Sequence, residues 1–268
     1  MLMKSDSPSP VLGANAESEN TAPASSVSTP AFPLRPAPFT GASRQVPVMR
    51  AFDWIQEGWS LFLGAPRAWL FLSGGILATF ALSDFIWLNV RTGFPPSLLR
   101  SLALAFLFLG PVVLMPIATA AGLYLCRLLA RGETPELDDL VIGLKQAPKR
   151  LLWAGSLTLA GWLLIYGFYE LTHGPLALFL PTLAGFSFLL AIWFIPPLVA
   201  FHGLSPIGAL NKGFAACLKN AGAFAVFGFT MALLHFVAVL PAGLGLVVLL
   251  PVVIGTLHAS YRDVFSES

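Results

Sequence analysis

The chain has 268 residues, of which 56% are hydrophobic and 10% are charged, and its formal net charge is +2. A soluble globular domain is typically about 45–50% apolar and about 25% charged, so this composition excludes an ordinary soluble domain. The small net charge says little by itself, and we expect no nucleic-acid partner.

Residues 1–45 are rich in Ser, Pro and Ala and contain few large apolar side chains. Such a segment cannot bury enough apolar surface to fold, which predicts a disordered cytoplasmic tail. No run of seven or more apolar residues occurs in it, so we expect no secretory signal peptide. Residues 46–265 are predicted to form the folded domain.

Long apolar runs fill this domain. A helix needs about 20 apolar residues to cross the roughly 30 Å hydrocarbon core of a bilayer. Because the runs are continuously apolar and do not alternate, a transmembrane β-barrel is not expected. We predict an all-α, multi-pass bundle of six transmembrane helices over residues 68–90, 103–126, 151–171, 177–200, 221–240 and 243–261.

Lys and Arg are distributed unevenly among the connections between these spans. If both termini are cytoplasmic, Arg91 and Arg100 are the only two of the 15 Lys and Arg residues on the outer side. An excess of basic residues is typical of cytoplasmic loops. The sequence therefore predicts a bacterial inner-membrane protein with both termini in the cytoplasm.

The segment before the first span is predicted to be an amphipathic helix. Its apolar stripe recurs at helical spacing and consists of Val48, Phe52, Ile55, Trp59 and Phe62. Charged and polar residues occupy the other side, so the helix is too polar to cross a bilayer but suited to lie along its surface. Trp54 and Trp59 are expected at the level of the lipid headgroups.

Two later segments follow the same plan. Thr134-Pro135 and Ser205-Pro206 have the residue types of an N-cap followed by a first helical residue. The stripes that follow them are Leu137, Leu140, Val141 and Leu144, and Ile207, Leu210, Phe214 and Cys217. The stretches APRAWLF (65–71) and APKRLLW (147–153) also match. We predict three repeats of an interfacial amphipathic helix plus a transmembrane hairpin, over about 46–130, 134–202 and 205–263.

Prolines and small residues recur inside the predicted spans. Prolines there can kink a helix and free backbone carbonyls, and they are Pro111, Pro116, Pro196, Pro197 and Pro251. Pairs of small residues four apart favour close helix packing, and they are Ala118/Gly122, Gly228/Ala232 and Gly255/Ala259.

Two sequence stretches carry a family resemblance. The stretch Gly58-Trp59-Ser60-Leu61-Phe62 followed by Pro66, the six spans and the ending SYRDVF (260–265) resemble a family of proteobacterial inner-membrane proteins of uncharacterised activity. The resemblance covers about residues 46–265. The repeating unit is more distantly similar to the membrane domain of glycerophosphoryl diester phosphodiesterases, whose soluble barrel this chain lacks. The resemblance implies an inner-membrane location and transfers no catalytic residue.

Four polar residues lie within or near the outer ends of the spans: Asp84, Glu170, His173 and His235. A carboxylate inside a membrane is by default a functional hypothesis, and together these residues could form a proton-linked or cation-binding cluster. The alternative is that Asp84 is a helix-end residue near the outer headgroups. Glu170 and His173 have the spacing E-x-x-H, but a di-iron bundle needs further carboxylates, and we expect no metal and no cofactor.

Seven basic residues are candidate contacts for anionic lipid headgroups on the cytoplasmic side: Arg67, Arg127, Lys149, Arg150, Lys212, Lys219 and Arg262. Each basic residue gains about 1 kcal/mol of attraction to an anionic membrane surface. This attraction explains the cytoplasmic position of these residues whether or not a specific lipid binds. His202 and His258 are expected near Arg127 and Arg262, either as interfacial polar residues or in a headgroup pocket. Cys126 and Cys217 lack metal-ligand spacing and are expected to be reduced.

The sequence contains no G-x-S-x-G motif, P-loop, Rossmann fingerprint or paired-carboxylate motif, which would indicate an enzyme. We therefore predict a non-enzymatic membrane scaffold or accessory subunit. Its partners would be membrane lipids and a membrane protein or a second copy of the chain. The alternative is a small-molecule, ion or lipid transporter or channel, and an intramembrane enzyme comes third.

Overall fold

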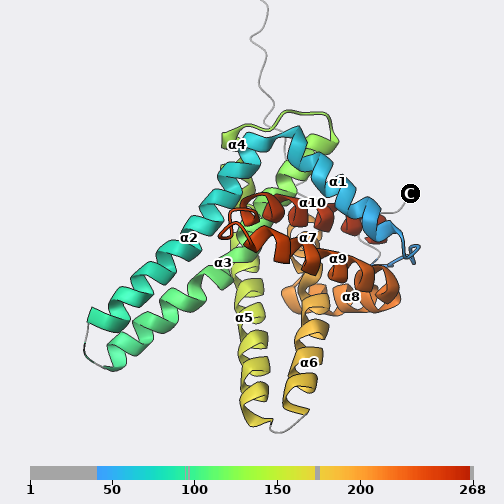
Figure 1. The fold of residues 1–268 in the computed structure, drawn as a ribbon. Helices are drawn as coiled ribbons and strands as arrows, with labels where there is room; N and C mark the ends of the chain where they lie inside the picture. Colours follow the sequence, from blue (N-terminus) through green and yellow to red (C-terminus); the bar gives the residue numbers. More distant parts are fainter. Residues whose placement is uncertain (1–40, 94, 96, 173–175, 266–268) are drawn as a thin grey trace, which may run out of the picture. The chain divides into compact units, whose positions relative to one another are not determined.

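The computed structural model describes residues 41–93, 95, 97–172 and 176–265. These residues form helices and contain no strand, so the predicted all-α class is confirmed (Figure 1). The described helices are α1 (Arg50–Gly64), α2 (Pro66–Gly93), α3 (Leu98–Ala130), α4 (Leu137–Leu144), α5 (Pro148–Leu171), α6 (Leu176–Trp193), α7 (Ile195–His202), α8 (Pro206–Lys219), α9 (Ala221–Val239) and α10 (Leu246–Phe265).

Within the described residues, six helical segments are long and apolar enough to cross a membrane, which indicates a multi-pass membrane protein. They are Pro66–Gly93, Leu99–Ala130, Pro148–Leu171, Phe179–His202, Ala221–Val239 and Leu246–Phe265. Each contains most of one predicted span. The sixth begins three residues later than predicted, because Ala242 and Gly243 have positive φ angles of 54° and 80° and form a turn.

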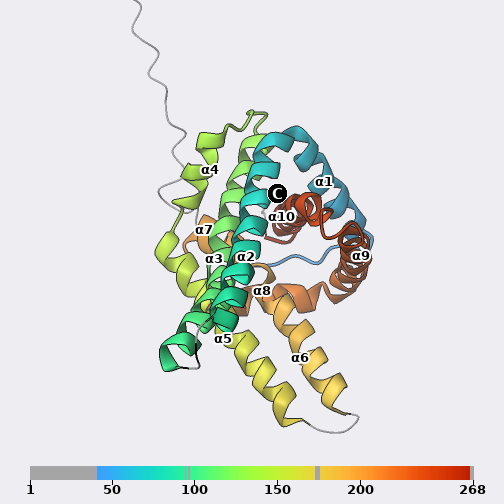
Figure 2. The same cartoon turned by 60° about the vertical axis from the view of Figure 1, so that its left-hand side comes forward.

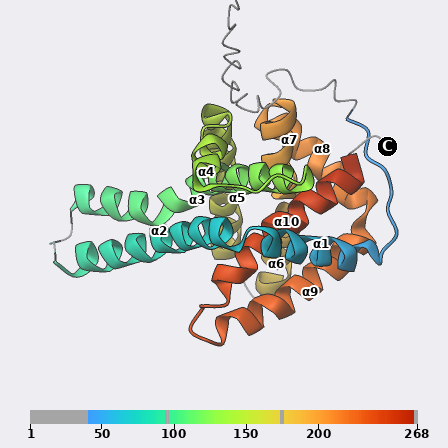
Figure 3. The same cartoon turned by 90° about the horizontal axis from the view of Figure 1, so that it is seen from above.

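A short helix precedes each pair of long helices: α1 precedes α2 and α3, α4 precedes α5 and α6, and α8 precedes α9 and α10. Figures 1 and 3 show that the three hairpins point in different directions away from the short helices. The hairpins contact one another in the halves that lie nearest to the short helices. Gly155 of α5 lies against Val113 of α3, and Ile254 of α10 lies against Gly122 of α3.

Each of the short helices α4 and α8 packs through a glycine on the second long helix of the hairpin that precedes it. A Cβ atom on Gly143 of α4 would lie 2.7 Å from the Cα atom of Ala121 of α3. A Cβ atom on Gly213 of α8 would lie 3.2 Å from the Cβ atom of Phe194, between α6 and α7. The missing side chains therefore allow close approach of the backbones.

Helix α1 makes the equivalent contact with the last hairpin. A Cβ atom on Gly255 of α10 would lie 2.7 Å from the Cα atom of Gly58 of α1. Figure 2 shows α10 among α1, α2 and α9. Because α4 packs on the first hairpin, α8 on the second and α1 on the third, the three units are joined in a ring.

The faces that α1 and α8 bury are rich in small residues. The buried residues are Ala51, Trp54, Gly58 and Phe62 on α1, and Pro206, Ala209, Gly213, Ala216 and Cys217 on α8. Large apolar side chains such as Phe52, Trp59 and Ile207 remain exposed. The interfacial position of these helices stays a prediction, and it would turn the exposed side chains toward the lipid tails.

One residue of the predicted interfacial helix, Trp54, is buried inside the protein. Trp54, which we expected at the level of the headgroups, does not face them, because it is only 1% exposed. Its ring packs against Phe224 of α9 at 5.4 Å between ring centroids. Trp59, in contrast, is exposed, and its position at the headgroup level stays a prediction.

The predicted helix starts are confirmed at α8 and wrong at α4. Ser205 accepts a hydrogen bond from the backbone N–H of Gly208 at 3.2 Å, and Pro206 is the first residue of α8. Helix α4 begins at Leu137, two residues after Pro135, with Glu136 as its N-cap. The Asp139 carboxylate accepts the backbone N–H of Glu136 at 2.8 Å, and this capping box sets the start.

The fourth span is interrupted at its prolines. Pro196 and Pro197 have no N–H to donate to the carbonyls four residues earlier, and the helix breaks at Phe194 between α6 and α7. The other three prolines that we expected to bend a span lie inside continuous helices. They are Pro111 and Pro116 in α3 and Pro251 in α10.

Candidate functional site

The polar residues predicted at the outer helix ends lie on three different hairpins. Asp84 is on α2, Glu170 on α5 and His235 on α9, and all three side chains are exposed. His173 lies outside the described residues. Among the described residues, no hydrogen bond or ion pair joins two of these side chains, and no cluster of three or more His, Cys, Asp or Glu could hold a metal ion. The structure does not bring them together, and their function stays a prediction.

The orientation of Asp84 follows from its buried neighbour. Ser83 donates a hydrogen bond to the backbone carbonyl of Leu107 on α3. That carbonyl has no helical donor, because Pro111, four residues later, lacks an N–H. Successive residues of a helix are about 100° apart around its axis, so Asp84 is turned away from α3 when Ser83 faces it.

We expect Ser83→Ala to lower the free energy of unfolding by about 1 kcal/mol, because the carbonyl of Leu107 loses its donor inside the protein. Unfolding by sodium dodecyl sulfate in mixed micelles measures this loss. The matched control is Thr79→Ala, since Thr79 is on the same helix but donates to its own helix, to Gly75, at an exposed position. An equal loss of unfolding free energy in both variants would show that the hydrogen bond between α2 and α3 does not contribute to stability.

The seven basic candidates all lie at the ends of the hairpins next to the short helices. Several are engaged within the protein. Arg262 forms an ion pair with Glu57 at 2.8 Å, and Lys219 donates to the backbone carbonyl of Ser43. Arg67 and Lys149 lie in the first turns of α2 and α5 and form no ion pair with a carboxylate of the described residues.

The remaining three basic candidates contact neighbouring segments. Arg150 donates to the backbone carbonyl of Gly203 at 2.6 Å. The guanidinium carbon of Arg127 lies 3.5 Å from the centre of the Phe201 ring. Lys212 lies against Gly41. These contacts account for part of the basic character of this end of the molecule without any lipid.

The two histidines expected near Arg127 and Arg262 belong to a polar cluster of α3, α7 and α10, in which His258 is buried and His202 is half-buried. His202 shares a hydrogen bond with the hydroxyl of Tyr261, and Arg127 stacks on the neighbouring Phe201. His258 is only 5% exposed, and its Nδ1 atom has no hydrogen-bond partner among the described residues. The cluster joins the three helices where the hairpins meet.

A second polar cluster, which sequence reasoning missed, surrounds Asp263 near the end of α10. The Asp263 side chain is 9% exposed. Its Oδ2 atom accepts the Trp54 Nε1–H at 2.8 Å and lies 2.6 Å from Nη2 of Arg50. Arg44 Nη2 lies 3.4 Å from Oδ1. We call Arg44, Arg50, Trp54 and Asp263 the terminal clasp, because they join residues near the two ends of the described chain.

The clasp favours the charged form of Arg50, which is already the ordinary form of an arginine. The hydrogen bond to Asp263 raises the pKa of Arg50 above its ordinary value. Asn220, at the junction of α8 and α9, extends the contact. Its amide oxygen accepts the backbone N–H of Val46 at 2.8 Å, and its amide nitrogen donates to the carbonyl of Arg44 at 3.0 Å. Residues 44–46 are thereby fixed to α8, α9 and α10.

Both cysteines are free thiols in buried positions, which is the structural role expected for them. Burial raises the pKa of the Cys217 thiol above its ordinary value. The thiol therefore stays protonated at neutral pH, and the protonated form is a poor nucleophile.

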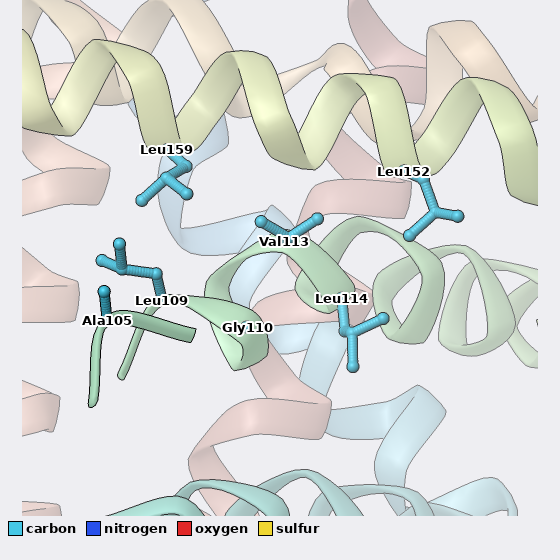
Figure 4. A pocket seen from close by; sticks show the side chains of 7 residues that line it. All are labelled: Ala105, Leu109, Gly110, Val113, Leu114, Leu152 and Leu159. Atoms are coloured by element: carbon cyan, nitrogen blue, oxygen red, sulfur yellow. The ribbon is translucent and has the colours of Figure 1, made fainter. Parts of the chain in front are cut away.

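Surface pockets lie along the helices. One, of about 430 Å³, runs between α3 and α5 and is apolar (Figure 4). A second, of about 230 Å³, is lined by Pro116 and Pro196 and by Thr119 and Thr158, among others. A third, of about 220 Å³, lies at the start of α2 and includes Arg67.

The arrangement thus comprises two polar clusters that join helices, one apolar groove and a basic end. Comparison with protein-family models, with curated proteins and with solved structures gives no significant match to this chain.

Proposed function

We propose that this protein is a non-enzymatic inner-membrane scaffold or accessory subunit. The observation that carries the proposal is the divergence of the three hairpins (Figures 1 and 3). Each hairpin exposes large apolar side chains in its outer half, such as Phe85 on α2, Leu164 on α5 and Phe236 on α9. Diverging hairpins present separate lateral faces on which helices of a partner protein or of a second copy can pack.

The proposed orientation has both termini in the cytoplasm. Its support is the distribution of basic residues along the hairpins. Among the described residues, Arg91 and Arg100 lie at the hairpin end far from the short helices, and the other Lys and Arg residues lie at the end near them. Basic residues accumulate on the cytoplasmic side of inner-membrane proteins.

The ring of short-helix contacts supports the proposal that the chain consists of three repeats. Equivalent glycines, Gly58, Gly143 and Gly213, mediate the contact of a short helix with a second long helix in each case. A repeated unit produces this equivalence directly, since the same helix face meets the same neighbour three times.

The test of the scaffold function is gentle purification from native membranes followed by mass spectrometry. We expect a stoichiometric protein partner or a defined oligomer. A photo-crosslinking residue placed in turn at Phe85, Leu164 and Phe236 then locates the contact, because a hairpin surrounded only by lipid gives no protein crosslink. A single chain that carries only lipid, with no protein crosslink from any of the three positions, would refute the scaffold function.

One observation favours transport as a second candidate function. The pocket beside Pro116 and Pro196 combines two interrupted or proline-containing helices with two hydroxyl groups, and broken helices often mark sites in transporters. A transporter that uses this pocket should lose flux in liposomes when Thr158 is replaced by Val.

Asp84→Asn tests the carboxylate separately. Normal growth of the Asp84→Asn strain, under a condition where the deletion strain fails, would count against an essential role for Asp84.

A further inference from the structure

We propose that the groove between α3 and α5 binds one anionic phospholipid, with an acyl chain in the groove and the phosphate at Lys149. This inference goes beyond the scaffold function, because it requires only that α3 and α5 lie in a bilayer. It assigns a specific ligand to one basic residue instead of a general attraction to the membrane surface.

The groove has the shape and chemistry of an acyl-chain site. It has a volume of about 430 Å³ and is lined by apolar residues only: Ala105, Leu109, Gly110, Val113, Leu114, Leu152 and Leu159. Figure 4 shows Leu159 opposite Ala105 and Leu109 at one end, Leu152 and Leu114 at the other, and Val113 between them. The groove therefore runs along the two helices.

The close contact of the two backbones explains why a groove forms beside it. Gly155 has no side chain, and a Cβ atom there would lie 2.7 Å from the carbonyl carbon of Val113. The helices touch at this point, while the longer side chains on either side of it hold the helix surfaces apart. Gly110 leaves further space, because a Cβ atom there would meet nothing within 4 Å.

Lys149 lies in the first turn of α5, about one helical turn before Leu152, the groove residue nearest to the start of that helix. Leu152 and Leu159 follow it by three and ten residues, so the three side chains share one face of α5. The long lysine side chain can extend to the headgroup level while its stem stays on the apolar surface. Its ammonium group forms no ion pair with a carboxylate of the described residues, whereas Arg150, on the adjacent face, donates to Gly203.

The first turn of α5 adds a second feature that favours a phosphate. The N-cap residue, Ala147, provides no side-chain acceptor for the free N–H groups of the first turn. Uncapped N–H groups and the helix dipole attract an anion. Helix α8 also begins with a proline, but its N-cap residue Ser205 accepts the backbone N–H of Gly208 at 3.2 Å. The phosphate of a lipid in the groove would complete the cap that α5 lacks.

The choice of an anionic phospholipid follows from both parts of the site together. A helix of another protein could cover the groove, but it would leave the ammonium group of Lys149 and the first turn of α5 without an anion. A zwitterionic lipid carries its own cation next to the phosphate, which weakens the attraction of Lys149. An anionic phospholipid satisfies the apolar groove and the positive end at the same time.

The chain offers matched controls for both parts. Lys145, the C-cap residue of α4, is an exposed lysine four residues before Lys149, and it is neither part of the groove nor one of the seven predicted lipid contacts. Gly75 of α2, like Gly110, would place a Cβ atom where nothing lies within 4 Å, but it is not part of the groove. Lys145→Gln and Gly75→Phe thus match Lys149→Gln and Gly110→Phe.

The test is native mass spectrometry of the delipidated full-length protein in detergent, titrated with dioleoyl phosphatidylglycerol or dioleoyl phosphatidylcholine. We expect one phosphatidylglycerol to bind more tightly than phosphatidylcholine. Lys149→Gln should weaken the binding of phosphatidylglycerol about fivefold and remove the preference, because one surface cation is lost. Gly110→Phe should abolish the binding of both lipids, since its ring fills the groove. The two control variants should bind like the wild type.

Several results would overturn the proposal. They are equal affinity of the wild type for the two lipids, a Lys149→Gln variant that keeps the preference, or a Gly110→Phe variant that binds normally. Complete competition by millimolar inorganic phosphate would show that the headgroup alone is recognised and would refute the role of the groove. A protein partner found in the co-purification would not change these lipid-binding results. The proposal of a lipid site and the proposal of a scaffold function can therefore fail independently.

Discussion

Replacing Asp263 by Ala is expected to lower the free energy of unfolding by about 2–4 kcal/mol, because three groups of the terminal clasp lose their acceptor. The buried Trp54 Nε1–H is left without a partner. Arg50 is 40% exposed, so water can partly replace the carboxylate, and the loss stays below that of a fully buried pair. Unfolding in mixed micelles, followed by tryptophan fluorescence, measures the change.

Two variants separate the effects within the clasp. Asp53→Ala removes the other carboxylate that contacts Arg50, at 3.1 Å, but this pair is exposed, and we expect a loss below about 1 kcal/mol. Asp263→Asn keeps an oxygen that can accept the Trp54 N–H, so its loss should lie between those of the two alanine variants. If Asp53→Ala were as damaging as Asp263→Ala, the buried position of Asp263 would not be the cause.

The large effect expected at Asp263 follows from the way the ring of units closes. Helix α4 is joined to α3 by residues 131–136, and α8 is joined to α7 by residues 203–205. The chain itself therefore keeps each of these short helices near the long helix that it contacts. No such connection joins α10 to α1. The contact of Gly58 with Gly255 and the terminal clasp hold this third junction by non-covalent interactions alone.

The parts of the fold that depend on local sequence could be predicted. The six spans follow from apolar runs of about 20 residues, and the start of α8 follows from Ser205-Pro206. The break in the fourth span follows from Pro196 and Pro197. In each case the cause lies within a few residues of its effect, in side-chain chemistry or in a missing backbone N–H.

The terminal clasp could not be predicted in the same way. Trp54 and Asp263 are 209 residues apart, and nothing in the periodicity of α1 indicates that it meets α10. Trp54 also has the residue type of a headgroup-level aromatic, which is why its burial was missed. Gly58 is a second residue of α1 whose burial was not predicted. In a membrane protein, small residues mark close helix contacts, so hydrophobicity alone does not identify the buried face.

Whether the outer polar residues form a cluster depends on the directions of the three hairpins, which the sequence does not give. Sequence gives the depth of Asp84, Glu170 and His235 along their helices to within a few residues. Because the three hairpins diverge, side chains at equal depth lie on separate parts of the structure (Figure 3).

Gly155→Ala is expected to lower the free energy of unfolding by about 1–3 kcal/mol, as overpacking in a close contact does. The new Cβ atom would lie 2.7 Å from the carbonyl carbon of Val113 and 2.8 Å from its Cα atom. Both atoms belong to the backbone of α3, so no side-chain rotation can relieve the clash. The two helices must separate, which loosens the contact between the first and second hairpins. Thermal unfolding of the purified protein in detergent measures the loss.

The matched control is Gly167→Ala on the same helix, where a Cβ atom would meet nothing within 4 Å. Alanine favours a helix over glycine by up to about 1 kcal/mol, so this variant should be as stable as the wild type or more stable. The same propensity gain also acts at Gly155, and the clash must therefore exceed it before any loss is observed. A stabilised Gly155→Ala protein would mean that α3 and α5 are not in backbone contact there, and the groove beside that contact would then need a different explanation.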